Sequence, residues 1–365
     1  FQARVPTRPP RTDTERELAA LWGRVLRVEE VGGEDDFFAL GGHSLLAARM
    51  FVEIRRIWGR DLPSTTLLHA PTVESLAAVI EDRAWAPSDR LVRMRRGEGR
   101  PLFVVHSLAG TVLQLWELLR ALTTERPVFG IQARGLDAAQ EAHASVEAMA
   151  QEYIELLRRE QPHGPYALAG YSFGGLVAFE MARRLEQAGE TVELLALVDT
   201  LVHERFLTGW QGLRSRLARP MRDLHAFRAV PAGERLAWLA DKRDVLVDRL
   251  RTRLGGRARR LDLVGGFSDE AHLPPALRRV RGGMMVAMRA YRPGPYAGRV
   301  VFARAAVPGS IDPVPVWRRA ARGGLALHTV PGDHEGLIKA PQVAALAALL
   351  DRHLGGDAAG APQPS

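Results

Sequence analysis

"YALAGYSFGG", residues 166–175, joins an apolar run to a glycine-rich turn and then to a helix-like segment. Residues 170–174 follow the pattern Gly-x-Ser-x-Gly, whose small residues leave room for a sharp strand-to-helix turn beside the serine. Such a turn presents the Ser172 hydroxyl at the carboxyl edge of a sheet, near the free N–H groups of a helix start. Ser172 is therefore our candidate nucleophile; the alternative is a structural turn serine.

Further apolar runs on both sides of this stretch are bounded by Pro, Gly or Ser. They are "PLFVVHS" (101–107), "RPVFGIQ" (126–132), "VELLALVD" (192–199), "GRVVFARA" (298–305) and "LALHTVPGDH" (325–334). Apolar strands that alternate with helices predict a mostly parallel sheet covered on both faces. We expect an α/β-hydrolase fold over residues 101–355, with a helical lid insertion at about 205–290.

A serine hydroxyl needs a base to become a nucleophile near neutral pH. His334 follows the last strand-like run, as the order Ser, acid, His of this fold requires. Asp199 ends the strand after the elbow helix, 27 residues beyond Ser172, and is the favoured acid. Asp312, after the next-to-last strand, is the alternative acid. Asp333, adjacent to His334, is expected to point away.

Acyl transfer also needs N–H groups that stabilise the developing oxyanion. Phe173, the residue after the nucleophile, supplies one of them. The second is expected from "HSLAG" (106–110), where either Leu108 or Ala109 can offer its N–H. We interpret His106 as a structural histidine at a strand end, and no metal ligands are assigned.

Residues 13–86 predict a separate small helical unit. Helical periodicity in "TERELAALWGRVL" and "PTVESLAAVI", and in a third segment that begins at Ser44, gives three main helices. A short fourth near residues 64–69 would complete a small four-helix bundle. We assign residues 1–12 and 87–100 as linkers and 356–365 as a disordered tail.

The composition of the chain argues against some classes of function. The 365-residue chain has a formal net charge of +8, but its arginines are scattered and it has only two lysines, Lys242 and Lys339, so no nucleic-acid role is expected. No apolar run is long enough for a membrane span, and no signal peptide is visible. The first residue is not Met, which suggests a fragment of a longer chain. The absence of cysteine suits the cytoplasm.

Ser44 precedes leucines and follows two glycines and a histidine in "DDFFALGGHSLLA", residues 35–47. From local pattern alone it is an N-cap serine. The stretch resembles the phosphopantetheine attachment site of peptidyl carrier domains in non-ribosomal peptide synthetases, and His43 favours a peptidyl over a polyketide carrier. "GYSFGG", "LVD" and "GDHEG" resemble the C-terminal thioesterase domain of the same assembly lines.

This resemblance implies that a phosphopantetheinyl transferase attaches 4′-phosphopantetheine from coenzyme A to Ser44. A phosphodiester is favoured at a helix N-terminus, and Gly41 and Gly42 keep the loop slim for the approaching enzyme. The peptidyl thioester would pass to Ser172 and leave by hydrolysis or macrocyclisation. Upstream condensation and adenylation domains are the implied partners.

The resemblance also supports Asp199 as the acid and places the oxyanion donors at Phe173 and Leu108. "HSLAG" departs from many relatives, which carry Pro after the His and a second Gly. In the lid, Trp210, Met221 and Trp238 either line an apolar substrate wall or pack lid helices. Two rival functions are a stand-alone serine esterase or lipase with a helical regulatory module, and a non-enzymatic scaffold.

Overall fold

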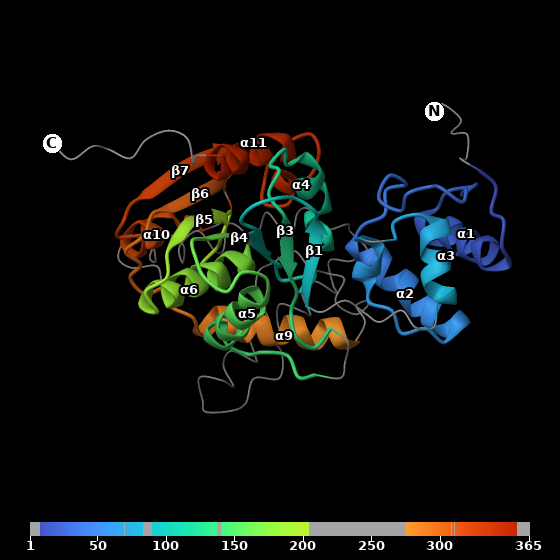
Figure 1. Ribbon diagram of the computed structural model, residues 1–365, viewed down its shortest axis with the longest axis horizontal. Coiled ribbons are helices and arrows are strands. Elements are labelled where there is room, and N and C mark those ends of the chain that lie inside the picture. Colours follow the sequence, from blue (N-terminus) through green and yellow to red (C-terminus); the bar gives the residue numbers. More distant parts are fainter. Residues whose placement is uncertain are drawn as a thin grey trace, which may run out of the picture.

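The computed structural model describes residues 8–68, 70–82, 90–136, 140–203, 275–307, 309 and 311–355. Figure 1 shows a small helical domain, drawn in blue, beside a larger domain built on a central sheet. The lid residues Trp210, Met221 and Trp238, most of the predicted lid and the predicted tail lie outside the described residues.

Three α-helices and a short 3₁₀-helix form the small domain: α1 (Asp13–Leu26), α2 (Ser44–Trp58), η1 (Ser64–Leu68) and α3 (Val73–Glu81). Side-chain oxygens start two of them, because Thr12 accepts from the Glu15 N–H and Thr72 accepts from the Ser75 N–H. The fourth element of the predicted bundle is thus one short 3₁₀ segment, confined between Pro63 and Pro71.

Seven strands form the sheet of the larger domain: β1 (Leu91–Arg95), β2 (Leu102–Val105), β3 (Val128–Ile131), β4 (Tyr166–Tyr171), β5 (Val192–Val198), β6 (Val300–Ala305) and β7 (Leu325–Val330). Their order is β1-β3-β2-β4-β5-β6-β7. Only β1 runs antiparallel to its neighbour, β3; the other five pairings are parallel. Two faces of this sheet must therefore be covered.

Helices cover both faces (Figure 1). One apolar cluster joins the sheet to α5 (Val146–Glu160), α6 (Phe173–Gln187), α9 (Pro275–Ala290) and α10 (Val314–Ala320). A second cluster joins the opposite face to α4 (Trp116–Ala121) and α11 (Val343–Leu354). The expected α/β-hydrolase architecture is confirmed, with α9 inside the range expected for the lid.

Strand β1 lies inside the segment 87–100 that we expected to be a linker. Leu91 and Val92 are buried while Arg93 is exposed, and Arg95 opposes Val128 after a register shift. The sequence of this short edge strand resembles a charged linker, because two arginines among its five residues leave neither a long apolar run nor a strict alternation. Among the described residues, no helix is long and apolar enough to cross a membrane.

Candidate active site

The turn between β4 and α6 holds Ser172 in a rare backbone conformation, with φ 56° and ψ −120°. Neighbouring glycines make this possible. A Cβ on Gly170 would lie 2.3 Å from the Gly174 carbonyl oxygen, and a Cβ on Gly174 would lie 2.2 Å from the His106 carbonyl oxygen. The local sequence therefore dictates a tight turn that places Ser172 at the carboxyl end of β4.

The structure brings Ser172, His334 and Asp199 together from the ends of three different strands. His334 Nε2 lies 3.0 Å from Ser172 Oγ, and His334 Nδ1 lies 2.7 Å from Asp199 Oδ2. Ser172 and Asp199 are 8% and 7% exposed, whereas the His334 side chain is 34% exposed. Because a carboxylate only accepts, Nδ1 carries the proton and Nε2 is left to accept from the serine hydroxyl.

Asp199 is held rigidly at the end of β5. Its N–H donates to the Ala303 carbonyl at 2.7 Å, and its Oδ1 accepts from the Ala305 N–H at 3.0 Å. Its φ of 41° is unusual for a residue other than glycine. The alternative acid, Asp312, instead accepts from the Val314 N–H at 3.1 Å, in its own loop. The geometry thus favours Asp199 over Asp312.

Asp333, beside His334 in the sequence, bonds within its own loop: its Oδ1 accepts from the Gly336 N–H at 2.7 Å and so shapes the loop after His334. The loop then enters η6 (Gly336–Ile338). This bond sets the backbone beyond His334 without adding a second carboxylate to the site.

The loop after β2 carries the expected second oxyanion donor. Within residues 107–110, the Ala109 N–H donates to Ser107 Oγ at 3.1 Å and the Gly110 N–H to the Ser107 carbonyl at 3.0 Å. Gln114 Nε2 also donates to Ser107 Oγ. No hydrogen bond within the described part of the chain uses the N–H of Leu108 or Phe173, which leaves these two groups available to a ligand.

His106 is fully buried and structural. Its Nδ1–H donates to the Ser107 carbonyl at 2.6 Å, and its Nε2 lies 2.7 Å from the Tyr153 hydroxyl. Burial lowers the pKa of His106 to about 4, so the ring is neutral and Nε2 accepts from Tyr153. The ring is also stacked on Phe173, at 6.3 Å between centroids. His106 therefore contacts both segments that carry the expected oxyanion donors: it bonds the backbone next to Leu108 and stacks on Phe173.

Sequence reasoning missed Tyr171, the residue immediately before the serine. Its hydroxyl donates to the His334 carbonyl at 2.6 Å, and its ring stacks on the imidazole with centroids 5.1 Å apart and 26° between planes. Burial raises the pKa of Tyr171, which keeps the hydroxyl protonated as a donor. A contact across 163 residues leaves no signal in a local pattern.

Ser44 is the first residue of α2, more than a hundred residues before Ser172 in the chain. The residue at the N-cap, His43, makes no capping hydrogen bond with its side chain, and the first turn of α2 holds no acidic residue. Gly41 has a φ of +86° and open space where a Cβ would stand, and a Cβ on Gly42 would lie 2.3 Å from the Phe37 ring. The loop before α2 therefore depends on its glycines, and the first turn of α2 itself carries no carboxylate.

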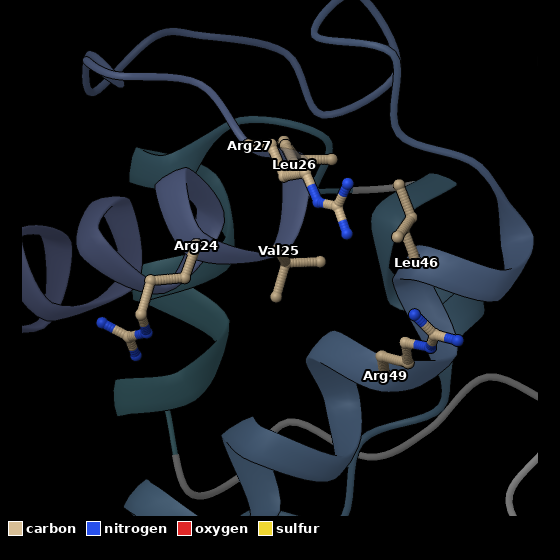
Figure 2. A pocket seen from close by; sticks show the side chains of 6 residues that line it. All are labelled: Arg24, Val25, Leu26, Arg27, Leu46 and Arg49. Atoms are coloured by element: carbon tan, nitrogen blue, oxygen red, sulfur yellow. The ribbon is translucent and has the colours of Figure 1, made fainter. Parts of the chain in front are cut away.

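A cavity of about 440 Å³ opens on the small domain close to this helix start. Figure 2 shows its lining of three arginines around apolar side chains: Arg24, Val25, Leu26, Arg27, Leu46 and Arg49. The first four belong to the end of α1 and its cap, and the last two to α2. A partner that approaches the start of α2 from this side meets positive charge.

Comparison with known families identifies both domains. The thioesterase domain family matches residues 100–354, and the phosphopantetheine attachment site family matches residues 16–80. The second match indicates a covalently attached 4′-phosphopantetheine on the small domain.

The relatives of the chain include nonribosomal peptide synthetases. It is 31% identical over 365 residues to CymA of Salinispora arenicola, described as a probable non-canonical nonribosomal peptide synthetase, and the match covers 95% of this chain and 4% of the relative. It is 43% identical over 190 residues to indigoidine synthase of Dickeya dadantii, covering 52% of this chain and 13% of the relative. The chain therefore spans a small part of the length of these curated relatives.

Solved structures agree. The four-domain nonribosomal peptide synthetase holo-AB3403 is 27% identical, with a TM-score of 0.55, over 96% of this chain and 27% of the synthetase. The type II thioesterase BorB from the borrelidin cluster shares the fold at 23% identity, with a TM-score of 0.50, over 74% of this chain and 100% of that one. Taken with the matched domains, these likenesses show that the chain belongs to the thioesterase domain family and is a peptidyl carrier–thioesterase didomain of the nonribosomal peptide synthetase type.

Proposed function

We propose that this didomain is the terminal, product-releasing part of a nonribosomal peptide synthetase. In this proposal the carrier presents a peptidyl thioester, Ser172 accepts the peptidyl group, and water or a nucleophile of the peptide releases it. The observation that carries the proposal is the continuous hydrogen-bond chain from Ser172 Oγ through His334 to Asp199.

Each proposed role follows from atom positions. His334 Nε2 would take the Ser172 proton as the oxygen attacks the thioester carbonyl, while Asp199 holds the imidazole and stabilises its positive charge. The Phe173 and Leu108 N–H groups would bind the oxyanion. When the carbon–sulfur bond breaks, His334 would return the proton to the departing thiolate, and Ser172 is left as an ester.

The second half of the reaction would use the same groups. His334 would take a proton from water, which gives a linear acid, or from a hydroxyl or amine of the peptide, which gives a ring. It would then return the proton to Ser172 as the ester bond breaks. Exclusion of water decides between the two products.

Ser44 is the proposed attachment residue of the phosphopantetheine arm, which supplies reach and the thioester linkage. The residues at the start of α2 suit a phosphodiester there, since this turn lacks both a side-chain cap and an acidic residue. Arg49, one and a half turns further along α2, adds positive charge nearby.

We also propose which proteins and domains the carrier domain meets. A transferase that carries coenzyme A would approach the carrier over the arginine-lined cavity of Figure 2, because coenzyme A is polyanionic. Condensation and adenylation domains are the proposed upstream partners, and the cytoplasm is the proposed location, because a chain without cysteine suits a reducing compartment.

Labelling with a fluorophosphonate probe tests the proposal. The wild-type chain should be labelled at Ser172, and both Ser172→Ala and His334→Ala should prevent labelling. Asp312→Asn is the matched control, because Asp312 bonds only within its own loop in the described structure. Labelling that persists in Ser172→Ala would show that the nucleophile lies elsewhere.

A further inference from the structure

The two domains meet through a compact contact. The Phe38 ring of the carrier stacks on Trp116 of the thioesterase domain, with centroids 4.6 Å apart and 23° between planes. Leu113, just before Trp116, is 2% exposed and packs within the apolar cluster that otherwise consists of carrier residues. A buried polar bond belongs to the same contact, because Gln132 Nε2 donates to Thr65 Oγ1 at 3.3 Å and both residues are buried. Stacked aromatic rings, a buried leucine and a buried hydrogen bond give this contact the close packing of a specific interface.

On the thioesterase side, this contact adjoins both loops of the proposed active site. Leu113 opens η2 (Leu113–Leu115), which directly follows the loop that holds Leu108. The Glu117 carboxylate, next to Trp116, accepts from the Ala340 N–H at 2.6 Å. Ala340 lies six residues after His334, so this bond holds the segment after the histidine against α4, the helix that begins at Trp116.

On the carrier side, Phe38 lies six residues before Ser44, in the loop that leads to α2. Desolvation lowers the pKa of His43, and the Lys339 ammonium and the Arg49 guanidinium lower it further. Lys339 belongs to the thioesterase domain, just beyond η6. The start of α2 and the segment after His334 are therefore within electrostatic reach of each other.

We propose that Leu113 and Trp116 form the docking surface that receives this chain's own carrier domain for delivery of its thioester, with Phe38 as the anchor on the carrier. This inference rests on the proposed function. Because the carrier is tethered to the thioesterase domain, a small contact is enough to hold it while still letting it leave for other domains. A few residues at the centre of a contact carry most of its strength, and tryptophan is enriched among them.

The test compares two ways of presenting one acyl group to the full chain. In the first, a transferase loads the acyl-pantetheine arm from acyl-coenzyme A, and a single turnover of release is followed. In the second, the same acyl group is a free N-acetylcysteamine thioester, which needs no docking. We expect Phe38→Ala and Trp116→Ala to lower the ratio of the first rate to the second by about tenfold or more. Val52→Ala, a matched truncation of an apolar residue that is 47% exposed on α2, should leave the ratio unchanged.

A distance measurement on the unloaded chain gives a readout independent of activity. The sequence contains no cysteine, so Val52→Cys with Arg352→Cys allows one spin label on each domain. We expect a narrow distance distribution for this pair and a broad one when Phe38→Ala is added.

The outcomes distinguish a failure of the docking surface from a failure of the proposed function. An unchanged ratio together with an unchanged distance distribution would overturn the docking surface. Equal losses with both substrates in Trp116→Ala and in Phe38→Ala would also overturn it, since they would show a purely structural role. If the wild type cleaved neither thioester, the proposed function would fail, and the distance measurement would still decide whether Phe38 anchors the carrier.

Discussion

Exchanging Asp199 for asparagine removes one charge and reverses one hydrogen bond. Asp199 Oδ1 accepts from the Ala305 N–H at 3.0 Å, so an asparagine must keep its oxygen there. Its NH₂ group then occupies the place of Oδ2, 2.7 Å from His334 Nδ1. Because NH₂ donates, Nδ1 must accept, and the ring proton moves to Nε2. An Nε2–H cannot accept the proton of Ser172.

The expected loss is large. The same exchange in the serine-protease triad lowers kcat by about 10⁴-fold, which corresponds to about 5 kcal/mol at about 1.36 kcal/mol per factor of ten. We expect a loss of this order for Asp199→Asn, because Asp199 is only 7% exposed and holds the imidazole through a bond of 2.7 Å.

The assay is steady-state hydrolysis of an N-acetylcysteamine thioester, with chemical denaturation to confirm that the variant is folded. Asp312→Asn serves as the matched control and should retain near wild-type kcat. A loss below tenfold in Asp199→Asn, or an equal loss in Asp312→Asn, would refute the reasoning about the acid.

The contacts of Tyr171, the burial of His106 and the arginines of the cavity can each be tested separately. Tyr171→Phe removes the hydroxyl that donates to the His334 carbonyl, so kcat should fall by about five- to tenfold with little change in KM; an unchanged kcat would argue against a positioning role. Burial lowers the pKa of His106 to about 4 in the folded chain, whereas the pKa of an unfolded histidine is about 6.5. Because the unfolded chain therefore binds a proton first, the free energy of unfolding should fall as the pH drops from about 6.5 to 4. The fall attributable to His106 should be about 3 kcal/mol, measured by denaturation against His106→Gln, and equal pH slopes in both proteins would contradict it. Replacing Arg24 and Arg27 by glutamate should slow loading by the transferase several-fold at low salt and less at high salt, in a loading assay followed by mass; a salt-independent rate equal to wild type would remove the cavity from the contact.

Local patterns predicted much of this molecule. The strand, glycine turn and helix around Ser172 are neighbours in sequence, so their geometry follows from sterics alone. Asp199 and His334 could be predicted because the carboxyl ends of parallel strands meet at one edge of a sheet.

Other features depend on contacts between distant segments. Strand β1 pairs with the edge that β3 offers, and its five residues alone form no long apolar run that would predict a strand. The contact of Tyr171 with His334 needs β4 and the loop after β7 to be placed by the whole sheet. The stack of Phe38 on Trp116 joins two domains whose separate sequences give no hint of their relative position.

In the proposed reaction, the peptidyl group passes from the arm on Ser44 to the hydroxyl of Ser172. The most direct test of this transfer follows the peptidyl group itself. The full chain is loaded from peptidyl-coenzyme A by a transferase, quenched at intervals, digested and mapped by mass spectrometry. We predict that the peptidyl mass appears first on the fragment that contains Ser44 and then on the fragment that contains Ser172, and that in Ser172→Ala it stays on the first fragment. Release from Ser172→Ala at the wild-type rate, with no adduct ever found on the second fragment of the wild type, would contradict the account.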